Sequence, residues 1–303
     1  MKLDHLQLAA LAAVVQEGSF ELAAQRLHVT PSAISQRIKA LEERLGQVLV
    51  LRTTPCRITE AGQPVLRYAV QLALLESEAM AALGVTYVEG TNAARSIRVP
   101  MVINADSFDS WFGVVFGALT DHPEWLIDIR VEDQDHSLAL LRDGSVMAGV
   151  SAAATPVQGC RVEPLGVMRY RALAAPAYLA RHFSEGLRAD DLARAPMLAF
   201  NRKDALQDQF LLQLAGIAVR PPTHTAPTTQ SFCEAIRRTL AWGMVPDQLS
   251  ADDLASGQLV DLAPGRWLDV PLYWHRWRLD SRALDALTRY VRDAARQALL
   301  PPA

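Results

Sequence analysis

Polar and cationic side chains gather on one face of a helix that the sequence predicts over residues 31–45. Thr30 can cap this helix, and Pro31 suits its first turn, where a missing N–H costs nothing. Helical spacing of apolar residues predicts an inward face made of Ile34, Ile38, Leu41 and Leu45. The opposite face carries Ser32, Ser35, Gln36 and Lys39, with Arg37 at its margin. Serine and glutamine can bond base edges and arginine can bind guanine or phosphate, so this face suits the DNA major groove.

A basic hairpin is predicted directly after this helix. Residues 47–51 and 58–59 are predicted strands, joined by a turn with an arginine at each end. Residues 31–58 contain five Lys or Arg side chains against two acids, although the formal net charge of the 303-residue chain is −3. An ordinary solvated face is the alternative for the helix alone, but the hairpin favours DNA. The predicted DNA contacts are Thr30, Pro31, Ser32, Ser35, Gln36, Arg37, Lys39, Arg52, Thr53 and Arg57.

Two further helices must position the polar helix. Residues 3–16 and 20–27 are predicted to be helical, because Gly18 can end the first helix and Ser19 can cap the second. Gly46 then ends the third helix. Helices joined by a tight turn and followed by a basic hairpin predict an all-α winged helix-turn-helix domain in residues 1–58.

Predicted strands and helices alternate from residue 96 onward. Strands at 97–103, 126–131 and 146–150, with helices at 110–119 and 137–141 between them, predict a βαβαβ unit and therefore a parallel sheet. Further elements between residues 170 and 262 predict a second α/β lobe, and a strand at 270–277 and a closing helix at 281–299 follow it. In open α/β sheets ligands sit at the carboxyl ends of strands, so the cleft between the lobes is the expected ligand site.

Polar residues at these strand ends are the candidate effector-binding residues. Asp106 could receive an ammonium group, whereas free N–H groups at the start of the next helix suit a carboxylate. Several acids around one cleft favour a dicationic ligand over a neutral one, although each acid alone could be a solvated loop residue or a helix cap. The candidates are Asn104, Asp106, Ser107, Glu132, Asp133 and Ser151, and across the cleft Asn201, Asp204, Thr228, Ser231 and Pro246.

A long helix is predicted between the two parts of the chain. Thr59 can cap it, and near-heptad spacing of Leu66, Val70, Ala73, Ser77 and Met80 predicts pairing with a second copy. Packing on its own domain is the alternative. The predicted domains are residues 1–58 for DNA binding, 59–84 for the linker helix, 85–95 for a hinge and 96–303 for the effector domain. Lobe I is expected over about 96–168 and 268–303, and lobe II over about 169–267.

Other classes of protein find little support in the sequence. Three cysteines without a CxxC pair predict a reducing cytosol, and no apolar run approaches the roughly 18 residues of a membrane span. The HExxH, GxGxxG and P-loop motifs are absent, and residues 149–153 lack the second glycine of a nucleophile elbow. Seven histidines show no metal-ligand spacing. We therefore expect a cytoplasmic protein that is not an enzyme and has neither cofactor nor metal.

The first sixty residues resemble LysR-type transcriptional regulators. The resemblance is carried by Gly18-Ser19-Phe20, Ala23-Ala24, Leu27, Thr30-Pro31-Ser32-Ala33-Ile34-Ser35-Gln36-Arg37-Ile38, Leu41-Glu42, Leu45-Gly46, Leu49, Leu51-Arg52 and Thr59-Glu60-Ala61-Gly62. It implies a homodimer formed through the linker helix, with a dimer of dimers as a further possibility, and a two-lobed effector domain of the periplasmic-binding-protein type. The implied partners are double-stranded operator DNA and, for an activator, RNA polymerase.

The effector domain resembles one branch of this family, the lysine-export regulators and their arginine-responsive relatives. The shared residues are Asn104-Ala105-Asp106-Ser107, Glu132-Asp133, Asp135-His136-Ser137-Leu138, Leu141-Arg142-Asp143-Gly144, Glu234-Ala235-Ile236, Trp242-Gly243-Met244-Val245-Pro246 and Tyr273-Trp274-His275-Arg276-Trp277. This resemblance implies that lysine, arginine or histidine is the effector and that a basic-amino-acid exporter gene is controlled. A LysR-type regulator of another effector, or a ligand-binding protein without a regulatory role, is the alternative.

Overall fold

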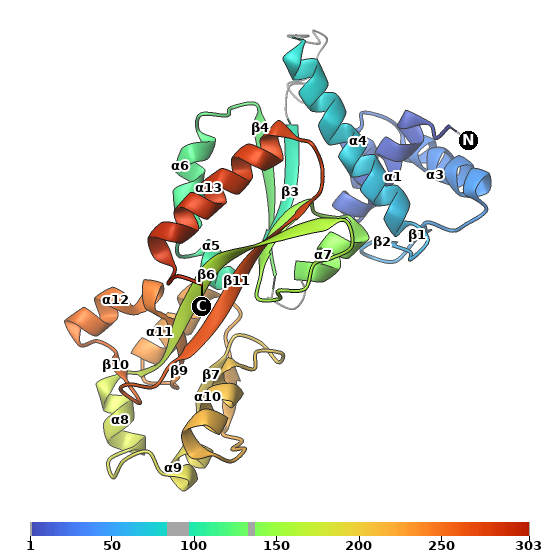
Figure 1. Cartoon of the computed structure of the whole chain (residues 1–303). Helices are drawn as coiled ribbons and strands as arrows, with labels where there is room; N and C mark the ends of the chain where they lie inside the picture. Colours follow the sequence, from blue (N-terminus) through green and yellow to red (C-terminus); the bar gives the residue numbers. More distant parts are fainter. Residues whose placement is uncertain (1, 84–96, 133–136, 303) are drawn as a thin grey trace. The chain divides into compact units, whose positions relative to one another are not determined.

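The computed structural model describes residues 2–83, 97–132 and 137–302 of the chain (Figure 1). The predicted hinge at 85–95 and the candidate residue Asp133 lie outside these ranges. The chain divides into two compact units: unit 1 comprises residues 1–104, 117–163 and 274–290, and unit 2 comprises residues 105–116, 164–273 and 291–303. Residues 105–116 and 291–303, which the sequence places in lobe I, group with unit 2, and the lobe boundaries stay a prediction.

Three helices form the N-terminal domain, as the sequence predicts. They are α1 (His5–Glu17), α2 (Phe20–Arg26) and α3 (Pro31–Leu45). The side chains of Asp4, Ser19 and Thr30 each accept a backbone N–H from the first turn of the following helix. Both α1 and α3 end at a glycine with a φ of +66°, a left-handed conformation that favours glycine. Their shared core contains Ala10, Leu11, Val14, Ala23, Ile34, Ile38 and Leu41.

The predicted hairpin is present, with shorter strands than expected. Strand β1 (Val50–Leu51) pairs antiparallel with β2 (Arg57–Ile58). One carboxylate oxygen of Glu42 on α3 accepts the backbone N–H groups of Leu49 at 2.8 Å and Val50 at 3.3 Å. The N–H of Cys56 in the turn donates to the carbonyl oxygen of Gly18 at 2.7 Å. The wing is therefore fixed both to α3 and to the turn between α1 and α2.

The linker helix α4 (Gln63–Ala82) begins four residues later than the predicted cap. The expectation that Thr59 caps it is wrong. The Thr59 hydroxyl donates to the carbonyl oxygen of Val48 at 2.7 Å and accepts the N–H of Gly62 at 3.0 Å, so it holds the turn before the helix. A Cβ atom on Gly62 would lie only 2.5 Å from the carbonyl oxygen of Leu49, which keeps this position free of a side chain.

The face of α4 that was predicted to meet a second copy is partly occupied within the chain. Leu66 and Val70 are only 0% and 6% exposed, because α4 packs against α1, which lies beside it in Figure 1, and against other elements of unit 1. The prediction of a dimer face through these two residues is therefore wrong, since a heptad pattern cannot distinguish an intramolecular partner from a second copy. Met80 of the predicted face is exposed, as are Tyr68, Leu75 and Leu83, which lie on or directly after α4 outside that face.

The rest of unit 1 confirms the predicted parallel sheet. Strand β3 (Ile97–Ile103) pairs in parallel with β4 (Trp125–Val131) and with β5 (Ala148–Ser151), and α7 (Ser137–Asp143) leads into β5. The helix predicted at 110–119 is the shorter α6 (Gly113–Leu119), and an additional short helix, α5 (Ala105–Phe108), precedes it. Trp111 and Phe112, in the turn between the two helices, are buried.

Two strands and the closing helix run from one unit into the other. Strand β6 (Cys160–Ala174) is longer than the predicted 170–174, and β11 (Leu268–Trp277) ends in unit 1, where the N–H of Trp277 donates to the carbonyl oxygen of Met147 at 3.0 Å. Helix α13 (Arg282–Ala298) closes the chain. Both strands and α13 therefore continue covalently through a boundary between the two units.

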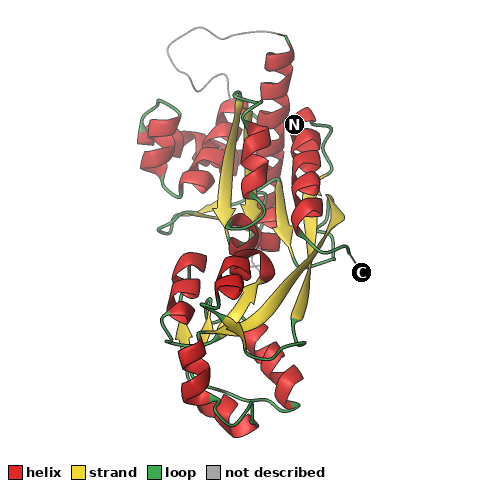
Figure 2. Ribbon diagram, turned by 90° about the vertical axis from the view of Figure 1, so that its left-hand side faces the viewer, coloured by secondary structure: helices red, strands yellow, loops and turns green. Residues whose placement is uncertain are grey.

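Unit 2 contains several helices that sequence periodicity did not reveal. In it β6 pairs antiparallel with β9 (Gly243–Pro246) and β10 (Val260–Asp261), while β7 (Met197–Ala199) pairs in parallel with β8 (Thr223–Thr225). The predicted helix near 232–240 is α11 (Thr229–Arg237). The additional helices are α8 (Pro176–His182), α9 (Ala189–Arg194), α10 (Leu206–Ala215) and α12 (Asp247–Ser256). Figure 2 shows the resulting mixture of helices and strands, which confirms the α/β class with an N-terminal winged helix-turn-helix.

Candidate functional site

Helix α3 presents its polar residues outward, as the sequence predicts. Ser32, Gln36 and Lys39 are exposed, while Ser35 and Arg37 are half-buried at the margin. Ile34, Ile38 and Leu41 on the opposite face are 0–1% exposed and form the core of the domain. This burial fixes the rotation of α3 about its own axis. Any partner that lies along its exposed face therefore meets hydroxyl, amide and cationic groups.

The start of α3 is held by its own polar residues. The Thr30 hydroxyl accepts the N–H of Ala33 at 3.2 Å and lies 2.9 Å from the Ser32 hydroxyl. Thr30 and Pro31 therefore have a clear structural role at this end, whether or not they also contact a partner. The Lys39 ammonium lies 3.6 Å from a Glu43 carboxylate oxygen, but both side chains are well exposed, so this pair contributes little to stability.

The wing places two further cations beside the helices. The Arg52 guanidinium lies 4.8 Å from the centre of the Phe20 ring, which holds it against the first residue of α2 by a cation–π contact. Arg57 is exposed on β2. The Thr53 hydroxyl donates to the carbonyl oxygen of Pro55 at 2.7 Å and so stabilises the turn. DNA contact by these three residues stays a prediction, and Phe20 is the positioning residue that sequence reasoning missed.

In unit 2, Asp106 has a buried partner. The hydroxyl of Tyr170, which is fully buried on β6, donates to a carboxylate oxygen of Asp106 at 2.7 Å. The neighbouring Ser107 is also fully buried, and its hydroxyl has no hydrogen-bond partner among the residues that the structure describes. Sequence reasoning missed Tyr170 because 64 residues separate it from Asp106. An acid oriented by a buried donor, next to a free hydroxyl, can receive a cationic group.

The other candidates in unit 2 hold turns and caps. Asp204 accepts the N–H groups of Phe200 and Leu206 at 2.8 and 3.1 Å, and Asn201 accepts that of Lys203 at 2.7 Å. Thr228 caps α11 by accepting the N–H of Ser231 at 3.2 Å, whereas Pro246 is buried at the end of β9. These contacts match the helix-cap and loop alternative that the sequence left open, and an effector contact by any of them stays a prediction.

The candidates in unit 1 differ sharply in exposure. Asn104, at the end of β3, is 2% exposed, and neither its amide nitrogen nor its amide oxygen has a partner within the described ranges. Ser151 is fully buried, and its hydroxyl accepts the N–H of Ala153 at 3.2 Å. Glu132 is exposed. Because a buried amide without partners is costly, Asn104 is the candidate in this unit that most needs an additional group.

A buried histidine contacts the residue that donates to Ser151 in unit 1. The His275 ring nitrogen Nε2 lies 2.9 Å from the carbonyl oxygen of Ala153, which can only accept, so Nε2 carries the proton. Burial lowers the pKa of this imidazole, so it is neutral at neutral pH. Nδ1 is then an acceptor, and it has no partner in the described part of the chain. The sequence favoured a packed strand residue over a catalytic base at this position, and the burial agrees.

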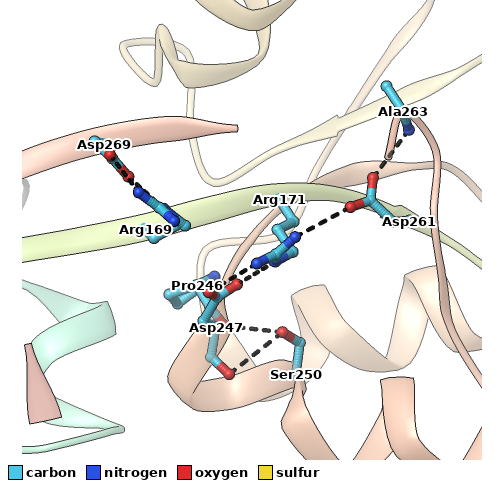
Figure 3. A network of polar contacts seen from close by, with 8 residues as sticks. All are labelled: Arg169, Arg171, Pro246, Asp247, Ser250, Asp261, Ala263 and Asp269. Carbon is cyan, nitrogen blue, oxygen red and sulfur yellow. Dashed lines mark hydrogen bonds and ion pairs between the residues drawn. The ribbon is translucent and has the colours of Figure 1, made fainter. Parts of the chain in front are cut away.

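Several acids of unit 2 are already paired with arginines (Figure 3). Arg171 donates to Asp247 at 2.7 Å and 3.4 Å and to Asp261 at 3.4 Å, while Arg169 makes two 2.8 Å bonds to Asp269. Hydrogen bonds from Arg169 lower the pKa of the Asp269 carboxyl. The Arg169 guanidinium also lies 4.1 Å from the centre of the Trp267 ring. This network ties β6 to the start of α12, to β10 and to β11, so these three acids have a structural role.

Metal ligation and membrane crossing are two further functions that a chain of this length could have. Within residues 2–83, 97–132 and 137–302, no three His, Cys, Asp or Glu side chains are arranged to hold a metal ion. Over the same residues, no helix has both the length and the apolar character that a membrane crossing needs.

The chain combines a winged helix-turn-helix, whose polar helix faces outward, with a long helix and an α/β domain that contains buried polar groups. This combination defines the class of ligand-responsive DNA-binding regulators. Residues 5–63 match the family of bacterial regulatory helix-turn-helix proteins of the lysR type, and residues 113–296 match the LysR substrate binding domain. The chain belongs to the LysR family of transcriptional regulators.

Named relatives cover nearly the whole chain. It is 51% identical over 294 residues to the HTH-type transcriptional regulator LysG of Mycobacterium tuberculosis, covering 97% of this chain and 94% of that protein. It is 42% identical over 300 residues to the lysine export transcriptional regulatory protein LysG of Corynebacterium efficiens, covering 98% and 99%. The solved structure of full-length LysG from Corynebacterium glutamicum with bound effector Arg superposes with a TM-score of 0.75 at 39% identity, covering 98% of this chain and 100% of that chain.

Proposed function

We propose that this LysR-family regulator senses a basic amino acid, namely lysine, arginine or histidine, and controls a gene for the export of basic amino acids. The observation that carries the proposal is the Asp106 carboxylate held by the buried Tyr170 hydroxyl. Two relatives support it by their names: one is a regulator of lysine export, and the other was solved with arginine as its effector. The relatives are transcriptional regulators, and we propose the same role, not an enzymatic one, for this chain.

The buried polar groups match the chemistry of such a ligand. A basic amino acid has a carboxylate, an α-ammonium group and a cationic side chain. The Asn104 amide supplies both a donor and an acceptor without described partners, and the Ser107 hydroxyl supplies another. Asp106 supplies negative charge. We propose that Asp106, which the buried Tyr170 hydroxyl orients, recognises the ligand cation, with Glu132 as the second candidate.

Matched pairs of amino acids test this proposal by calorimetric titration of the full-length protein. L-Citrulline has nearly the shape of L-arginine without the charge on the side chain. L-Norleucine has nearly the shape of L-lysine without the side-chain ammonium group. A hydrogen bond to a charged group contributes about 1.5–3 kcal/mol, so we expect each basic amino acid to bind at least roughly tenfold more tightly than its neutral counterpart. Equal affinities within both pairs, or no heat with lysine, arginine or histidine, would contradict the proposal.

We also propose that the regulator acts in the cytoplasm on operator DNA, as a dimer or a dimer of dimers. In this proposal two copies pair through the exposed apolar side of α4. Tyr68 and Leu75, seven residues apart and so on one side of this helix, are 50% and 38% exposed. Removing such side chains from water favours association by about 25 cal/mol per Å² of apolar surface. Sedimentation velocity should show a dimer or larger species that Leu75→Asp shifts toward monomer. A monomeric wild-type protein at micromolar concentration would contradict this assignment. Activation would add RNA polymerase as a partner.

A further inference from the structure

The linker helix carries an acid that caps a helix of the effector domain. Both belong to unit 1. Glu78 on α4 accepts the Ser281 hydroxyl at 2.6 Å, the N–H of Ala283 at 2.9 Å and the N–H of Arg282 at 3.3 Å. Ser281 directly precedes α13, and Arg282 and Ala283 begin it, where backbone N–H groups lack partners within the helix and a negative charge is favoured. We call this set of contacts the Glu78 latch.

A second contact lies eleven residues earlier on the same helix. The guanidinium of Arg67 is 5.3 Å from the centre of the Trp277 ring. The stem of Arg67 also touches the turn after α7, because a Cβ atom on Gly144 would lie 2.2 Å from its Cγ atom. Eleven residues are about three helical turns, or roughly 16 Å, along α4. Two contacts at this spacing resist rotation of α4 as well as its separation from the effector domain.

Both contacts meet one short segment, residues 277–283. Trp277 is the last residue of β11, and the indole N–H of Trp277 donates to the carbonyl oxygen of Val146 at 3.2 Å. Residues 268–273 of β11 belong to unit 2, whereas its last four residues belong to unit 1. The segment that α4 holds is therefore the continuation of a strand that comes from unit 2. Helix α4 also packs on α1 of the DNA-binding domain.

We propose that the Glu78 latch couples effector binding to the DNA-binding domain. A shift of β11 on effector binding would reach residues 277–283 directly, and the latch would pass it to α4 and so to α1. Such coupling needs the effector to favour one of two arrangements of this segment. The proposal rests on the proposed function, because it requires a small effector. It assigns to Glu78 a role beyond capping. Loss of the latch should change how α4 responds to the bound effector more than it changes the affinity of the protein for the effector.

Hydrogen–deuterium exchange of the full-length protein, with and without saturating L-arginine, tests the latch. The variants are Glu78→Ala, Glu78→Gln, which keeps one acceptor oxygen, and Ser281→Ala, which removes a donor from the other side. Glu76→Ala is the matched control, because it removes the same charge from the same helix, where the half-exposed carboxylate lies 3.4 Å from the exposed His5 ring. Calorimetry measures the affinity for L-arginine of each protein in parallel.

Without ligand, loss of a cap of this kind should speed exchange of the amides of residues 282–284 about fivefold in Glu78→Ala. With L-arginine, we expect exchange in residues 66–82 of the wild type to change, and this change to be lost in Glu78→Ala and partly kept in Glu78→Gln. The arginine affinity of Glu78→Ala should stay within about threefold of wild type, below the range of typical allosteric coupling. Glu76→Ala should behave as wild type.

The outcomes separate the latch from the proposed function. If wild type binds arginine and Glu78→Ala transmits the same change to α4, the coupling role is overturned while the sensing function stands. A wild type that binds arginine without any change in α4 also overturns it. If wild type binds no basic amino acid, the proposed function fails, and the coupling role with it. Unchanged exchange at residues 282–284 in both Glu78→Ala and Ser281→Ala would overturn the latch itself.

Discussion

Arg37→Ala is expected to weaken binding to operator DNA by about 5- to 150-fold, the range that corresponds to losing a base contact worth about 1–3 kcal/mol. Arg37 lies at the margin of the exposed face of α3, and no hydrogen bond or ion pair within the described residues engages its guanidinium. Its planar donors can therefore turn to guanine or to a phosphate. Gln36→Ala should have a smaller effect, because an uncharged amide makes a weaker contact.

Fluorescence anisotropy on a duplex that the wild type protects in footprinting measures both affinities. Salt dependence separates the two possible partners of Arg37. Loss of a phosphate contact lowers the slope of log affinity against log salt by about one, whereas loss of a base contact relaxes sequence preference at one position. Arg181→Ala is the control, because it removes an equal charge from an exposed position on α8. Unchanged affinity in both the Arg37 and the Gln36 variants would contradict the assignment of α3 as the recognition helix.

Asp106→Asn is expected to weaken L-arginine binding by about 10- to 100-fold, as removal of one partner of a charge-assisted hydrogen bond does. The amide has nearly the shape of the carboxylate and can still accept the Tyr170 hydroxyl through its oxygen, so the fold should be kept. Tyr170→Phe should give a loss of several fold, because it removes the donor that orients the carboxylate and leaves the charge.

The ratio of the affinities for arginine and citrulline tests this second prediction more sharply than the arginine affinity alone. Asp106→Asn should bring the two affinities together, since the lost attraction acts on the charge alone. Asp208→Asn is the control, because it removes the same charge from an exposed position on α10. Glu132→Gln tests the second candidate acid. Full affinity for arginine in both Asp106→Asn and Glu132→Gln would show that these acids do not recognise the ligand.

Local sequence signals predicted the N-terminal domain well. Helix ends are specified by contacts within three residues, at Ser19, Thr30 and the two left-handed glycines. The inward face of α3 is specified by the spacing of Ile34, Ile38 and Leu41 alone. The parallel order of β3, β4 and β5 followed from the alternation of strands and helices. These elements could be predicted because the determining interactions lie close together in the sequence.

Long-range contacts limited the remaining predictions. The Tyr170–Asp106 bond joins residues 64 apart, and the Glu78 contacts join residues more than 200 apart, so no spacing rule could reveal either. Periodicity identified the apolar face of α4 at Leu66 and Val70 but could not show that the chain itself buries it. The network of Arg169 and Arg171 likewise assigns three acids to structural roles that their sequence positions do not reveal.

The most direct test of the account is the affinity of the full-length protein for its operator, measured with and without each basic amino acid. Allosteric coupling typically changes affinity about 5- to 150-fold, and we expect saturating L-arginine or L-lysine to produce a change in this range or to alter the pattern of protected bases. L-Citrulline and L-norleucine should have no effect at the same concentrations. Identical affinity and identical protection with arginine, lysine and histidine would contradict the conclusion that this LysR-family regulator senses basic amino acids.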